Sequence, residues 1–177
     1  MDSSDRITRL SNMLYWASTV LACALPCIVI MAIARGWFDP ALLPKQFPAL
    51  SDGIKISVAQ GVIMAVIGVV SVWPLMAALL AMRDLFARYR RGEILTDACA
   101  SDILRIGRAL VLVATTTVVV PMLQLLVLSW GSKQGRILSI GINDSTLGFL
   151  VSGCLLYTIG WVMREAARAA AENAEFI

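Results

Sequence analysis

The chain has 177 residues, of which 59% are hydrophobic and 15% are charged, and its formal net charge is +3. Soluble globular proteins contain about 45 to 50% apolar residues, so this composition excludes an ordinary water-soluble domain. The basic residues lie at the ends of apolar runs and form no continuous basic face, which argues against nucleic-acid binding.

Four apolar runs follow one another along the chain, at residues 13–34, 58–82, 109–130 and 145–163, and none contains Asp, Glu, Lys or Arg. As helices they would be about 28 to 38 Å long, close to the ~30 Å hydrocarbon core of a bilayer. The sequence therefore predicts an all-α fold: an integral membrane four-helix bundle that forms a single transmembrane domain over residues 1–177.

The first run has an alternative interpretation as a cleaved signal peptide, because Ala32-Ile33-Ala34 fits a small-x-small cleavage site. Its apolar stretch is longer than the usual core of such a peptide, and the acidic and basic residues ahead of it cancel one another. We therefore expect a membrane span.

The distribution of lysine and arginine predicts the orientation of the spans. Ten of the 15 basic residues lie in the N-terminal arm, in the hairpin at residues 83–108 and in the tail at residues 164–177, and five lie in the other two connections. Because cytoplasmic loops are enriched in Lys and Arg, both termini, the hairpin and the tail are expected in the cytosol.

The two outer connections contain segments rich in β-branched residues, at 53–58 and 136–142. These segments would either pair as a small β-ribbon or form the irregular starts of helices.

Proline residues interrupt three of the spans, at Pro26, Pro74 and Pro121. Each proline ring removes a backbone donor and leaves the carbonyl four residues earlier without its helical partner, so kinked spans are expected. Ser71 and the hydroxyls of Thr115–Thr117 are the nearby groups expected to compensate for the lost hydrogen bonds.

Small residues recur at helical spacing in two spans and favour close helix packing, with a helix of the same chain or of a second copy in a homo-oligomer. The residues concerned are Gly61, Ala65 and Gly68 in the second span, and Thr146, Gly153 and Gly160 in the fourth. Gln60 and Gln124 are the only amides in the spans. We expect them to form interhelical hydrogen bonds, and contact with a substrate is the alternative.

The hairpin at residues 83–108 should be a helix, a turn and a second helix. Gly92 is expected to end the first helix in a left-handed conformation, and Thr96 to cap the second. Asp84 and Arg88 have the i, i+4 spacing of a helical ion pair. Three arginines of the hairpin, Arg88, Arg90 and Arg91, have two alternative interpretations. They serve only as a topology signal, or they contact lipid or a partner protein.

Catalytic and metal-binding patterns are absent from the sequence. It has four cysteines, Cys23, Cys27, Cys99 and Cys154, but no histidine, so a zinc site is not expected. It also has no phosphate-binding glycine loop and no Ser, His and Asp set. We expect no cofactor, no metal and no enzymatic activity. An enzyme acting on lipid head groups would have only Asp144, Arg164 and Glu165 near an interface.

Several short motifs resemble the domain of unknown function 2975 family of small bacterial membrane proteins. They are Leu85-Phe86, residues 92–96, residues 103–107 and the closing segment at residues 160–177. The resemblance implies a four-span protein of the bacterial inner membrane, with no assigned catalytic residues and no known ligand.

The expected function is a non-enzymatic accessory, regulatory or interaction component that presents the hairpin and tail to an unidentified protein partner. The tail has high helix propensity, so the last helix should extend into the cytosol. The alternative is a small channel or transporter subunit, with Thr115–Thr117 and Gln124 along its path.

Overall fold

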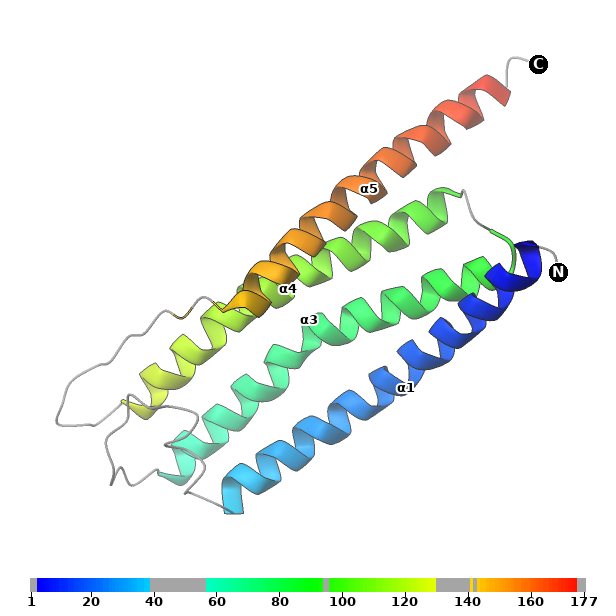
Figure 1. Ribbon diagram of the computed structural model, residues 1–177. Coiled ribbons are helices and arrows are strands. Elements are labelled where there is room, and N and C mark those ends of the chain that lie inside the picture. Colours follow the sequence, from blue (N-terminus) through cyan, green and yellow to red (C-terminus); the bar gives the residue numbers. More distant parts are fainter. Residues whose placement is uncertain (1–2, 39–56, 94–95, 130–140, 142, 175–177) are drawn as a thin grey trace.

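The computed structural model describes residues 3–38, 57–93, 96–129, 141 and 143–174 (Figure 1). These residues form four helices, α1 (Ser3–Phe38), α3 (Val58–Arg90), α4 (Asp97–Leu128) and α5 (Asp144–Ala174), and no strand. All four helices are long and apolar enough to cross a membrane. The prediction of an all-α four-helix bundle is confirmed.

The helices pack in chain order, α1 on α3, α3 on α4 and α4 on α5, and α4 has its most extensive contact with α5 (Figure 1). Within the described residues no other pair of helices makes an extensive contact. The outer faces of α1, α3 and α5 therefore keep large apolar side chains exposed, such as Ile30, Trp73 and Trp161. This distribution is typical of a protein surrounded by lipid, because lipid can cover apolar side chains that water cannot.

Two residues define the turn between α3 and α4. Gly92, just after the end of α3, has a φ angle of 80°, which is the left-handed conformation expected for it. The Thr96 hydroxyl accepts a hydrogen bond from the backbone N–H of Cys99 at 3.3 Å, so Thr96 is the N-cap of α4 as predicted.

Hydroxyl groups near the prolines bond differently from the prediction. Pro26, Pro74 and Pro121 all lie inside helices. Ser71 donates to the Gly68 carbonyl at 2.7 Å, and Thr115–Thr117 donate to carbonyls three or four residues earlier in α4. The expectation that these hydroxyls bond the carbonyls freed by proline is therefore wrong, because the carbonyls one turn back lie within closer reach.

The last helix extends beyond its apolar run, as predicted, and reaches Ala174. Arg168 and Glu165 form an i, i+3 ion pair at 3.9 Å on this extension. Residues 53–56, 136–140 and 142 make up most of the segments considered for a β-ribbon, and they lie outside the described residues. Ser57 directly precedes α3, and its N–H donates to Gln60 Oε1 at 2.9 Å.

Candidate functional site

The best-packed part of the described chain is the end of α3 and α4 that adjoins the hairpin. The buried cluster there consists of small and aliphatic side chains from both helices, namely Ala78, Ala81, Leu85, Cys99, Ile103, Ile106, Ala109 and Leu110. Phe149, Leu156 and Met163 of α5 pack against it. Helices α3, α4 and α5 therefore pack together at this end of the chain.

A buried carboxylate lies beside this cluster. The Asp102 side chain is only 1% exposed, and its Oδ2 accepts a hydrogen bond from Arg88 Nε at 2.8 Å. Arg105 reaches its other oxygen at 3.8 Å, and Arg88 also approaches Glu93 at 3.7 Å. A buried charge needs such partners because desolvation is costly. The predicted pairing of Arg88 with Asp84 is wrong, since Arg88 turns across the hairpin to α4.

The buried thiol of Cys99 links the start of α4 to the backbone of the turn. Cys99 is fully buried, and its Sγ donates to the Glu93 carbonyl at 2.9 Å. Cys23, Cys27 and Cys154 have exposed side chains on the apolar helices, and all four cysteines are free. Among the described residues no three His, Cys, Asp or Glu side chains are placed to hold a metal ion.

Glycines bring α4 and α5 into backbone contact. A Cβ atom added to Gly107 would lie 2.6 Å from the Tyr157 backbone nitrogen and 2.9 Å from the Gly153 carbonyl oxygen. Added Cβ atoms on Gly153 and Gly160 would each lie 2.9 Å from a backbone nitrogen of α4, that of Val111 and that of Leu104 respectively. The fourth span therefore uses its small-residue stripe against a helix of its own chain.

The small residues of the second span do not behave in the same way. A Cβ atom added to Gly68 would meet no heavy atom within 4 Å, so none of the described helices of this chain packs closely at Gly68, and packing against a second copy stays a prediction. Gly61 is partly buried in the same helix. The small residues share one helix face, but within the described chain the face of α3 at Gly68 has no backbone against it.

Polar contacts also cross between helices within the spans. The Gln60 side chain donates from Nε2 to the Val127 carbonyl at 3.1 Å and so joins α3 to α4. The hydroxyls of Thr117 and Thr146 are 3.1 Å apart and join α4 to α5. Gln124 is partly buried and forms no side-chain hydrogen bond with the residues that the structure describes.

The three arginines singled out in the hairpin have different environments. Arg88 forms an ion pair with Asp102, whereas the exposed Arg91 is the C-cap residue of α3. The guanidinium of Arg90 lies over the ring of Tyr15 in α1, with its Cζ 5.0 Å from the ring centroid. Arg83 shares that ring at 5.6 Å, a convergence that the sequence did not indicate because it depends on the packing of α1.

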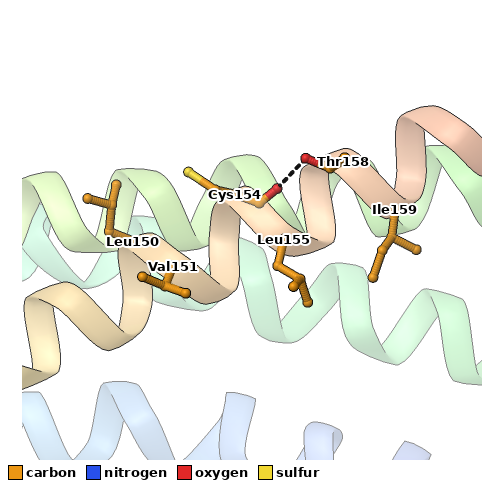
Figure 2. A pocket seen from close by; sticks show the side chains of 6 residues that line it. All are labelled: Leu150, Val151, Cys154, Leu155, Thr158 and Ile159. Atoms are coloured by element: carbon orange, nitrogen blue, oxygen red, sulfur yellow. Dashed lines mark hydrogen bonds between the residues drawn. The ribbon is translucent and has the colours of Figure 1, made fainter.

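A shallow apolar surface on α5 offers little to a specific ligand. It is lined by Leu150, Val151, Cys154, Leu155, Thr158 and Ile159, all from this one helix (Figure 2). The Thr158 hydroxyl already donates to the Cys154 carbonyl at 2.9 Å. Because specific pockets combine apolar walls with free polar groups, this surface is better suited to lipid chains.

Residues considered for lipid head-group chemistry are not brought together. Asp144 begins α5, whereas Arg164 and Glu165 lie near its other end. Arg164 Nε approaches Asp97 Oδ1 at 3.4 Å and links the extension of α5 to the start of α4. This pair makes the hairpin and the tail parts of one connected surface.

Four membrane-length helices with apolar outer faces define a multi-pass α-helical membrane protein. The family described as protein of unknown function (DUF2975) matches residues 38–177, and the chain belongs to this family, as its motifs predicted. Almost all of α1 precedes the matched region. No curated protein and no solved structure matches the chain.

Proposed function

We propose that the protein is a non-enzymatic accessory or regulatory component of the bacterial inner membrane. Its termini face the cytosol, and the hairpin with the adjacent extension of α5 forms the surface that binds a protein partner. The support for this proposal is the arrangement of residues at this end of the helices.

The observation that carries the proposal is the internal support of the hairpin. The Asp102 carboxylate, 1% exposed and held by Arg88, joins the two sides of the turn, and the buried cluster lies directly beneath. A preformed surface loses little conformational entropy on binding, which favours recognition of a partner.

The proposed partner surface carries exposed positive charge. Arg91 is exposed and Arg105 is 68% exposed, and the contact of Arg105 with Asp102 is long at 3.8 Å. Exposed arginines of this kind suit a partner with complementary acidic groups, because they steer association and can form bidentate hydrogen bonds with carboxylates.

A channel or transporter has less support from the same structure. Thr115, Thr116 and Thr117 all donate to carbonyls of their own helix, so their hydroxyl protons are not free to line a path. Transport pathways also tend to contain ionisable groups within the membrane, and the four apolar runs contain no Asp, Glu, Lys or Arg.

Site-specific crosslinking in the native host tests the proposed partner surface. A photo-crosslinking amino acid replaces Ala98, a half-exposed residue in the first turn of α4. We expect one discrete protein adduct in intact cells, and its yield should fall several-fold when Arg91→Glu is added, because the reversed charge repels an acidic partner.

The matched control is Arg35→Glu, which makes the same charge change at an exposed position at the other end of α1. This variant should leave the adduct yield unchanged. Absence of any adduct from position 98, or equal losses with both charge reversals, would contradict the proposed partner surface.

A further inference from the structure

Two cations of α3 converge on one aromatic ring of α1. Arg83 and Arg90 are seven residues apart, close to two helical turns, so they lie on the same face of α3. Their guanidinium carbons are 5.6 and 5.0 Å from the centroid of the Tyr15 ring. Like charges repel, so their meeting at a neutral ring indicates a place where an anion would be favourable.

Neither cation is neutralised by an ion pair among the described residues. The carboxylates that form ion pairs in this part of the chain pair with other arginines, namely Arg88, Arg105, Arg164 and Arg168. Asp84 follows Arg83 directly in the helix, but it is exposed and lies about 100° around the axis from it. Arg83 Nε is also buried without a hydrogen-bond partner, so the pair retains both positive charge and an unused donor.

Contact with Tyr15 leaves most of the binding capacity of the arginines available. A cation–π contact depends on the charge of the guanidinium over the ring, and each guanidinium has five N–H donors in its plane. That fork of donors matches the oxygens of a phosphate group. Tyr15 therefore holds two phosphate-binding groups side by side, and most of their donors, Arg83 Nε among them, stay available.

The position of these residues along the helices indicates which phosphate-containing molecule lies close to them. Tyr15 and the exposed Trp16 lie at the start of the first apolar run, and Arg83 directly follows the second. Tyrosine, tryptophan and arginine at such boundaries lie at the depth of lipid head groups. The anion concentrated at that depth is the phosphate of an anionic lipid.

We propose that Arg83, Arg90 and Tyr15 form a binding site for the phosphate of an anionic lipid head group between α1 and α3. The site joins α1 to a helix of the DUF2975 region, and it does not include Arg91 and Arg105, the exposed arginines proposed to meet the protein partner. Bound lipid would neutralise the two cations and strengthen the contact of α1 with α3.

Lipid binding to delipidated, detergent-purified protein tests the site, with native mass spectrometry as the readout. The probes are phosphatidylglycerol, phosphatidylcholine and inorganic phosphate. We expect phosphatidylglycerol to bind in preference to phosphatidylcholine, and Arg83→Gln/Arg90→Gln to weaken its binding roughly 30-fold, from the electrostatic contribution of two basic residues at an anionic surface.

The matched control is Arg91→Gln/Arg168→Gln, which removes the same charge from two exposed positions away from Tyr15. This control should bind phosphatidylglycerol as the wild type does. Arg83→Lys/Arg90→Lys keeps the charge without the planar fork and should give an intermediate loss, which tests the site even if the glutamine variant fails to fold.

Three results would overturn the proposal. The first is equal binding of the two lipids by the wild-type protein, and the second is an equal loss in the control variant. The third is full displacement of phosphatidylglycerol by an equimolar amount of inorganic phosphate, which would assign the site to a free anion instead of a lipid.

Discussion

Gly107→Ala should separate α4 from α5 and destabilise the protein by about 3 kcal/mol, the upper part of the usual range for overpacking. The added Cβ would lie 2.6 Å from the Tyr157 backbone nitrogen and 2.9 Å from the Gly153 carbonyl oxygen. Backbone atoms cannot rotate away as a side chain can, so the helices must move apart. This loss outweighs the ~1 kcal/mol that alanine gains over glycine in helix propensity.

The measurement is the free energy of unfolding of the purified protein in mixed micelles as the SDS fraction is raised. Gly148→Ala in α5 is the matched control, because its Cβ would meet no heavy atom within 4 Å. It should be as stable as the wild type, or more stable by up to about 1 kcal/mol. Equal stabilities of the two alanine variants would show that α4 and α5 are not in backbone contact at Gly107.

Arg88→Ala should also have a large effect, about 3 kcal/mol, because it leaves a buried carboxylate without its main partner. Asp102 is 1% exposed, and the remaining contact with Arg105 is 3.8 Å long. Asp102→Ala should cost less, about 2 kcal/mol, because the Arg88 side chain is 34% exposed and can be hydrated after the loss.

A double-mutant cycle in the same unfolding assay separates the pair from the individual side chains. Arg88→Ala/Asp102→Ala should be less destabilised than the sum of the single variants, because neither charge is then left unpaired. Arg105→Ala, at a residue 68% exposed, should change stability by less than about 1 kcal/mol. Strict additivity of the two single losses would mean that Arg88 and Asp102 do not interact.

Features set by local sequence could be predicted, and those set by packing between distant helices could not. The apolar runs indicated the four helices because the length of a run decides whether it can span a bilayer. The left-handed Gly92 and the Thr96 cap depend only on their neighbours in the chain. The partner of Arg88 was missed because helix spacing favoured Asp84, whereas the fold buries Asp102 and so makes it the stronger partner.

The role of Gly107 was missed although the sequence contains a signal for it. Ala100, Gly107 and Ala114 repeat every seven residues in α4, the same period as Thr146, Gly153 and Gly160 in α5. Two matching small-residue stripes indicate two helices that approach each other closely. The signal does not say which helix a stripe meets, since the face of α3 at Gly68 meets no backbone among the described residues of this chain.

The contact between Tyr15 and the two arginines of α3 could not be predicted from the sequence alone. The sequence shows that Arg83 and Arg90 share a helix face, but it does not say which helix that face meets. Long-range packing of α1 decides this. The proposed lipid site therefore depends on the three-dimensional arrangement more than any other feature of the chain.

In the proposed topology the hairpin and the tail lie together in the cytosol, and four helices cross the membrane. Labelling of single cysteines with a membrane-impermeant maleimide tests it directly, in a background without the four native cysteines. We expect Arg91→Cys and Glu172→Cys to be labelled in inside-out vesicles but not in intact spheroplasts, and Arg35→Cys to show the reverse. Labelling of position 91 or 172 in intact spheroplasts would contradict it.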